Sequence, residues 1–336
     1  MRIITTTGYY ATGSSAITDF LSEFDNCKSL TNYEFRFVQD PGGISDLEFA
    51  LVENHHRHNS GYALKRYKQL VDFLAGNMFI KKYEYFFHGQ WKKLSYEYIE
   101  ALTDFRFRGY WAYDVKERGL LFYYRKRLIS KLLQKTLYRN NEERHYNEMP
   151  NEITYCSRPT EEYFLDCTRK YIDKLFSSVN EKHKPDVMVD QIVASSNVNR
   201  YIRYFNDIRV FVVERDPRDL YLLARYKWHL SILPTDLELF CKWYKYTRAH
   251  RKEENYDQRF VMFLYFEDMI YKYQETSLKI MSFLDYSSDH HIKPRTMFIP
   301  EISINGTRLW KTDLGHNHYQ EIAYIEKELS EYLYRY

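Results

Sequence analysis

The stretch IRVFVVERDPRD, residues 208–219, is the part of this chain that decides its expected fold. Its first half is β-branched and aromatic, as in a strand buried in a parallel sheet. Asp216 is placed to cap a following helix, Pro217 suits the first position of that helix, and Asp219 lies three residues after the cap. Strands and helices alternate from residue 185 onward, which predicts an α/β fold with a parallel sheet.

Two arginines occupy the same junction. Arg215 comes directly after the strand, and Arg218 falls in the first turn of the helix. Open α/β sheets bind ligands beyond the carboxyl ends of their strands. Guanidinium groups held at such a position suit phosphate. The junction therefore predicts a site for a phosphorylated compound.

The amino terminus predicts a second part of that site. Residues 2–6 are β-prone, GYYATGSS follows at 8–15, and the next residues form one apolar helix stripe. The spacing is that of G-x-x-x-x-G-K-[ST], but Ser14 stands at the lysine position. We expect backbone N–H groups, the helix amino terminus and two hydroxyls to form an anion cradle. The alternative is a glycine turn that only joins a strand to a helix. The stripe residues are Ala16, Ile17, Phe20, Leu21 and Phe24.

Together the two motifs resemble the sulfotransferase family that uses 3′-phosphoadenosine 5′-phosphosulfate (PAPS). The resemblance rests on a lysine-free loop of the form x-G-[ST]-[ST] and on R-D-P-R-D at a later strand end. The segments 186–215, 260–284 and 305–311 also resemble parts of that family. The resemblance covers residues 1–40 and 185–315. It implies a parallel sheet of the P-loop NTPase-like sulfotransferase type, flanked by helices. The residues between the matching parts resemble nothing in the family, and their helical spacing predicts a large helical insertion.

The resemblance also implies how the donor is bound. The first loop of the family holds the 5′-phosphosulfate, and the arginine junction holds the 3′-phosphate. Ser14 then has a catalytic role as well, since it stabilises charge on the leaving phosphate. No metal is implied. The expected donor-binding residues are Thr12, Gly13, Ser14, Ser15, Arg215, Arg308 and Lys311.

A general base is expected just after the second strand, LTNYEFRF, where the carbohydrate-acting branches of the family place a glutamate. Glu34 fits that position, and strand alternation puts it on one face with Arg36. The alternative is an ordinary solvent-facing Glu–Arg pair. Asp40 and the histidines at 55–58 are the other candidates for the base.

Two positions depart from the family pattern. Ala11 stands where the family usually has Lys or Arg two residues before the loop glycine, so Arg36 or Lys311 would have to replace that cation. Leu223 stands where a serine usually binds the 3′-phosphate. The 3′-phosphate assignment therefore depends mainly on Arg215.

We expect one sulfotransferase domain over residues 1–336, with residues 45–180 forming a mainly helical insertion that is a candidate acceptor-binding cap. Helices are expected over 61–138 and 163–179, and Arg118 to Lys135 is amphipathic. The polar stretch 139–155 is expected to be a loop.

Composition restricts the function further. A net charge of +3 over 336 residues argues against a dedicated nucleic-acid binder. Four cysteines without metal spacing predict free thiols in a reducing compartment. No signal peptide and no apolar run near 18 residues is apparent, so we expect a cytoplasmic protein without an integral membrane segment.

The sequence thus predicts a PAPS-dependent sulfotransferase that acts on a hydroxyl of a carbohydrate or glycolipid. The carbohydrate preference comes from the position of Glu34 and from the aromatic-rich insertion. A non-catalytic relative that binds a nucleotide or glycan is the alternative, since Ala11 and Leu223 depart from the pattern. A P-loop phosphotransferase is disfavoured because the loop has no lysine.

Overall fold

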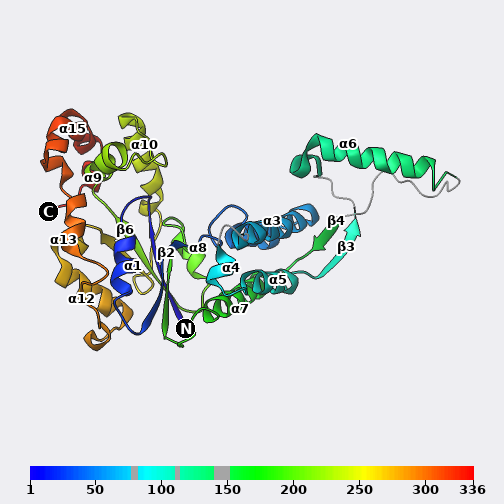
Figure 1. Cartoon of the computed structure of the whole chain (residues 1–336), viewed down its shortest axis with the longest axis horizontal. Coiled ribbons are helices and arrows are strands. Elements are labelled where there is room, and N and C mark those ends of the chain that lie inside the picture. The colour runs from blue at the N-terminus through cyan, green and yellow to red at the C-terminus, as the bar shows by residue number, and fades with distance from the viewer. Residues whose placement is uncertain (77–81, 110–113, 140–151) are drawn as a thin grey trace.

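The computed structural model describes residues 1–76, 82–109, 114–139 and 152–336. Its centre is a five-stranded sheet in the order β2-β5-β1-β6-β7, and every pair of neighbouring strands is parallel. Helices flank this sheet, so the predicted α/β class is confirmed (Figure 1). The strands are β1 (Arg2–Gly8), β2 (Cys27–Glu34), β5 (Asp186–Asp190), β6 (Ile208–Glu214) and β7 (Val261–Tyr265).

Side chains that alternate along the strands divide the core into two apolar clusters, one on each face of the sheet. Ile3 packs in the cluster that includes residues of α7 (Glu161–Ser177) and Val198 of α8 (Val198–Ile202). Ile4 packs in the cluster formed with α1 (Ser15–Leu21) and α12 (Tyr273–Leu284). The chain therefore leaves β1 toward one face and leaves the neighbouring β5 toward the other. Such a switch point creates a crevice at the carboxyl ends of the strands.

At the junction after β6, the helix cap at Asp216 forms as the sequence predicts. The role expected of Asp219 differs from the one that it has in the structure. The Asp216 carboxylate accepts a hydrogen bond from Arg218 N at 2.9 Å, and α9 (Pro217–Leu222) begins at the proline. Asp219 does not reach back to the cap. It accepts from Arg308 N at 2.8 Å and from Leu309 N at 2.7 Å, so it fixes a distant segment onto α9.

The insertion is more complex than the sequence suggests. It contains an antiparallel pair, β3 (Phe105–Gly109) and β4 (Glu152–Cys156), so the helical assignment is wrong at 105–109 and the loop assignment is wrong at 152–155. The rest of that predicted loop, 140–151, lies outside the described residues. We call β3, β4 and the helix α6 (Asp114–Lys135) the arm, and Figure 1 shows it extending away from the sheet.

The remaining helices surround these parts. In the insertion, α5 (Trp91–Ala101) packs on both α3 (Arg57–Ala75) and α7. Near the carboxyl terminus, α9, α10 and α15 form a third apolar cluster. No helix in the described ranges combines the length and apolarity that crossing a membrane requires. The remaining α-helices are α2 (Ile44–Glu48), α3 (Arg57–Ala75), α4 (Tyr83–Phe86), α5 (Trp91–Ala101), α10 (Leu237–Arg248), α11 (Asp268–Tyr271), α13 (Pro300–Ser303), α14 (Asp313–Asn317) and α15 (Tyr319–Glu328).

Candidate active site

A cavity of about 1040 Å³ lies at the carboxyl ends of the central strands. The loop after β1 lines it, together with residues that follow β5, Glu34 at the end of β2 and Arg215 after β6. The structure therefore brings together most of the site residues that the sequence predicts. Those that line the cavity are Thr12, Gly13, Ser14, Ser15, Glu34 and Arg215.

The loop between β1 and α1 has a backbone conformation that residues other than glycine rarely adopt. Tyr10 and Ala11 have φ values of 65° and 55°, in the left-handed region, and Gly13 has a φ of 89°. A Cβ on Gly13 would lie 2.5 Å from a ring carbon of Phe266, so glycine is required there for space as well as for conformation. Consecutive left-handed residues without glycine cost about 1–2 kcal/mol each. Strain of this kind is concentrated at functional sites.

Ser14 is positioned by a residue that the sequence analysis did not single out. Gln191 follows β5, and its Nε2 donates to Ser14 Oγ at 3.2 Å. Gln191 also lines the cavity and has a φ of 57°. Because Ser14 Oγ accepts this bond, and no described residue accepts the hydroxyl proton, Ser14 can donate to a ligand.

Arg215 is a buried cation, and none of the described carboxylates forms an ion pair with it. Its exposed fraction is 3%, its Nη2 donates to Gly306 O at 2.7 Å, and its guanidinium lies over Phe266 at 4.4 Å from the ring centroid. Arg215 Nε is buried and has no hydrogen-bond acceptor among the described residues, which also include no carboxylate in ion-pair contact with it. Burial lowers the pKa of this guanidinium. A buried cation in this state is suited to bind an anionic ligand.

The carboxyl groups nearest to Arg215 balance its positive charge only in part. Glu267 accepts from Asp216 N at 2.9 Å, and burial raises its pKa to about 8. Burial also raises the pKa of Asp219 to about 6. Both carboxyl groups therefore hold their protons more readily than an exposed carboxyl group, which weakens the negative charge next to Arg215.

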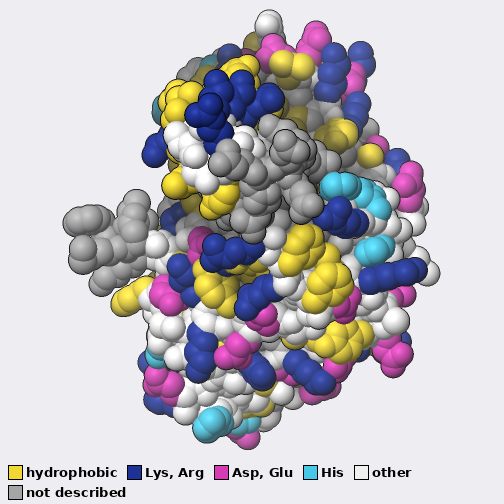
Figure 2. All heavy atoms as spheres, turned by 90° about the vertical axis from the view of Figure 1, so that its right-hand side faces the viewer, with side chains coloured by type: hydrophobic (Ala, Val, Ile, Leu, Met, Phe, Trp, Pro, Cys, Tyr) yellow, Lys and Arg dark blue, Asp and Glu magenta, His cyan; other side chains and the backbone are white. Residues whose placement is uncertain are grey.

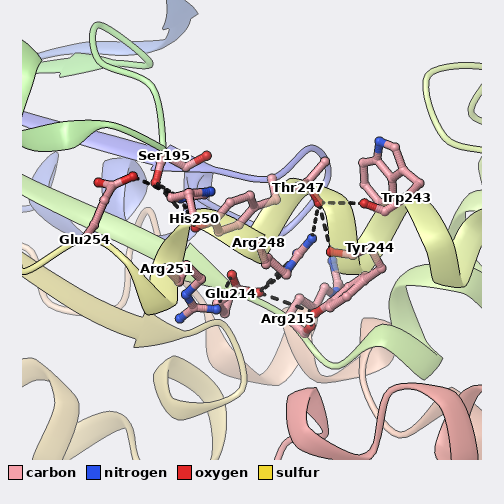
Figure 3. Close-up of polar contacts among 11 residues, drawn as sticks. Ser195, Glu214, Arg215, Trp243, Tyr244, Thr247, Arg248, His250, Arg251 and Glu254 are labelled. Atoms are coloured by element: carbon pink, nitrogen blue, oxygen red, sulfur yellow. Dashed lines mark hydrogen bonds and ion pairs between the residues drawn. The ribbon is translucent and has the colours of Figure 1, made fainter.

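The preceding residue shows the opposite arrangement (Figure 3). Glu214 ends β6 and accepts from Nε and Nη2 of Arg248, both at 3.1 Å, and from Nη1 of Arg251 at 3.0 Å. Tyr244 donates its hydroxyl to the carbonyl of Arg215 at 2.9 Å. These contacts satisfy the Glu214 charge internally and fix the backbone from which Arg215 extends.

Glu34 lies beside a second carboxyl group at the cavity. Its carboxylate is 3.6 Å from Nη1 of Arg36, which also pairs with Asp40 at 2.9 Å. In the sheet register Glu34 is the partner of Asp190, the last residue of β5. Asp190 lines the cavity and accepts from the Thr6 hydroxyl. Burial, with a smaller contribution from the Glu34 charge, raises the pKa of Asp190 to about 6. The only feature of the sequence that points to Asp190 is its place at the end of a strand.

The structure does not bring Arg308 and Lys311 into the cavity. The Arg308 guanidinium lies over the rings of Tyr271 and Tyr336, at 4.4 Å and 4.3 Å from their centroids. Lys311 lies over Trp310 at 4.8 Å. The neighbouring Gly306 does line the cavity, so this segment contributes its backbone rather than its cations.

Arg218 and the histidine cluster are also placed elsewhere. Arg218 is held by Asp216 at 2.6 Å and by Glu326 at 2.7 Å, so its charge is already paired and the expectation that it suits a phosphate is wrong. His55 contacts the carbonyl of Ser157 at 2.9 Å, and His56 caps α3. Neither histidine lines the cavity. In the described ranges no group of three or more His, Cys, Asp or Glu could hold a metal ion.

No family model matches the sequence, and no curated protein does. Among solved structures, the chain is similar to sulfotransferase STF9 from Mycobacterium avium, with 11% identity, a TM-score of 0.39, and coverage of 98% of this chain and 75% of that one. It is also similar to sulfotransferase STF1 from Mycobacterium tuberculosis H37Rv, with 11% identity, a TM-score of 0.34, and coverage of 91% and 76%. The α/β class is established by the sheet itself, and likenesses this distant add nothing about residue roles.

Proposed function

We propose that this protein is a sulfotransferase that takes a sulfuryl group from PAPS and transfers it to a hydroxyl of a carbohydrate or glycolipid. The observation that carries the proposal is Arg215, a buried cation that faces the same cavity as the loop 8–15 and lacks an anionic partner among the described residues. Two anion-binding elements on one cavity suit a compound with separate anionic groups at its two ends.

The residues of the cavity fit the donor in the following way. The loop residues Thr12, Gly13 and Ser14 would hold the 5′-phosphosulfate, and Arg215 would hold the 3′-phosphate. Leu223, at the position of the family's phosphate-binding serine, is buried in an apolar cluster and contributes nothing to this contact. Arg215 is therefore the main determinant of 3′-phosphate binding in this proposal.

The proposed reaction uses Glu34 as the general base. The acceptor oxygen attacks sulfur, Glu34 takes the hydroxyl proton, and the bond between sulfur and the phosphate oxygen breaks. Ser14 and the loop amides stabilise the negative charge that develops on the leaving phosphate. Arg36, which also lines the cavity and lies beside Glu34, is the cation available in place of the one missing at Ala11.

No described residue of the insertion 45–180 lines the cavity, so its role as an acceptor-binding cap stays a prediction. The cytoplasmic location also stays a prediction.

Titration calorimetry with adenosine 3′,5′-bisphosphate and with ATP tests the donor. We expect the bisphosphate to bind and ATP to bind far more weakly. Tight binding of ATP alone would instead support a phosphotransferase. Transfer of labelled sulfate from PAPS to a glycan panel then tests catalysis, and bisphosphate binding without any transfer would support the non-catalytic alternative.

A further inference from the structure

The helix α6 presents an apolar stripe to solvent. Leu121, Tyr124, Leu128 and Leu132 follow one another at intervals of three and four residues, so they share one helix face. Their exposed fractions are 86%, 62%, 60% and 54%. An exposed row of large apolar side chains on one face indicates an interaction surface.

Basic residues border this stripe. Arg125, Lys131 and Lys135 are exposed and form no ion pair with any described residue. Figure 2, which views the molecule from the end of the arm, shows dark blue and yellow side chains gathered where α6 lies. Residues 114–139 contain eight Lys and Arg against two acidic residues, although the whole chain carries only +3. The positive charge of the protein is therefore concentrated on this segment.

We propose that α6 is a docking surface for an anionic lipid bilayer. A helix that lies in a membrane interface buries its apolar face among the acyl chains and places flanking Lys and Arg at the anionic headgroups. The stripe and its basic borders match that pattern. A second copy of this chain fits less well, because two α6 helices facing each other across a twofold axis would bring like charges together.

The base of the helix is anchored to the rest of the protein. Lys65 of α3 pairs with Glu117 at 2.7 Å, near the start of α6. The cavity, by contrast, receives no described residue from the arm. Lipid binding is therefore separable from the donor site, and the inference does not depend on the proposed sulfotransferase activity.

Co-sedimentation of the full-length protein with vesicles tests this surface. We expect binding to phosphatidylcholine vesicles that contain phosphatidylglycerol, and much weaker binding to vesicles of phosphatidylcholine alone. The binding should weaken as salt rises, because exposed charges are screened. Equal binding to both vesicle types, or no binding to either, would overturn the proposal.

Variants identify the surface. The double variant Leu121→Asp, Leu128→Asp and the triple variant Arg125→Glu, Lys131→Glu, Lys135→Glu should each weaken vesicle binding by about tenfold or more, since one basic residue near an anionic surface alone contributes roughly fivefold. Leu278→Asp is the matched control, because that leucine on α12 is 66% exposed and remote from the stripe in sequence.

Two further measurements separate a loss of lipid binding from misfolding and from self-association. Circular dichroism and bisphosphate binding should be unchanged in every variant, since the substituted side chains are exposed. Sedimentation velocity without vesicles tests self-association. Concentration-dependent dimers that Leu121→Asp abolishes, together with absent vesicle binding, would assign the surface to a second copy instead.

Discussion

The cavity and the arm both contain cations that no described carboxylate pairs with, but the two sets differ in their exposure. Arg215 is buried, so its charge is costly unless a ligand compensates it. Arg125, Lys131 and Lys135 of α6 are in water, where an unpaired charge costs little. A positively charged side chain therefore has a different meaning in the two regions. A buried arginine such as Arg215 indicates a site for a specific anion. Exposed cations indicate a binding surface only together with the apolar stripe beside them.

The largest effect is expected in the cavity, from Glu34→Gln. Loss of a general base lowers turnover by about 10²- to 10⁴-fold, and the amide keeps the size of the side chain. Binding of adenosine 3′,5′-bisphosphate should not change. Turnover and calorimetry on the same preparation measure both. Glu275→Gln is the control, because Glu275 is exposed and does not line the cavity. Full activity of Glu34→Gln would reassign the base, and Asp190 would be the next carboxylate to substitute.

Arg215→Ala tests whether this buried cation is required for binding the 3′-phosphate. We expect the affinity for adenosine 3′,5′-bisphosphate to fall by roughly 2–5 kcal/mol, as when one partner of a buried charge pair is removed. Affinity for adenosine 5′-monophosphate, which lacks the 3′-phosphate, should change much less. Calorimetry with both nucleotides gives the comparison. An equal loss for both would mean that Arg215 does not contact the 3′-phosphate.

Glu267→Gln tests whether the carboxyl group of Glu267, which lies near Arg215, is protonated in the folded protein. Burial raises the pKa of Glu267 from 4.5 to about 8, so the folded protein holds a proton that the unfolded chain releases. This contribution to stability is complete below about pH 4.5 and is lost as the pH rises through about 8. Glutamine cannot ionise, and the variant should therefore lose less stability over that window, by about 1.4 kcal/mol for each pH unit between the two pKa values.

Urea denaturation at several pH values between these limits measures that difference. Glu275→Gln serves as the control, because Glu275 is exposed and the nearby Lys279 lowers its pKa. The same pH dependence in the native protein and in Glu267→Gln would show that Glu267 does not hold the proton.

The smallest effect is expected in the arm. Lys131→Ala should change the free energy of unfolding by no more than about 0.5 kcal/mol, because the side chain is exposed and forms no ion pair with a described residue. Thermal or urea denaturation measures it. A loss well above 1 kcal/mol would place Lys131 in the packed structure and weaken the contrast between the two regions.

Local chemistry made much of the fold and site predictable. The cap at Asp216, the proline after it and the apolar run before it are neighbours in sequence, and so are the residues of the loop 8–15. These patterns located the strand ends, and the common edge of a parallel sheet then brought the loop, Glu34 and Arg215 together.

Features that depend on distant partners were not predictable. The segment 105–109 becomes a strand only because it pairs with 152–156. Asp219 has the spacing of a capping residue, yet the backbone of Arg308 and Leu309 takes both its oxygens. Arg308 itself has the charge of a phosphate ligand, but two tyrosine rings hold it away from the cavity.

A crystal structure with bound adenosine 3′,5′-bisphosphate would show whether the loop 8–15 and Arg215 hold the two ends of one ligand. We expect one phosphate against the loop 8–15, within reach of Ser14, and the other against the guanidinium of Arg215. A nucleotide bound outside this cavity, or one that leaves Arg215 without contact to either phosphate, would contradict this expectation.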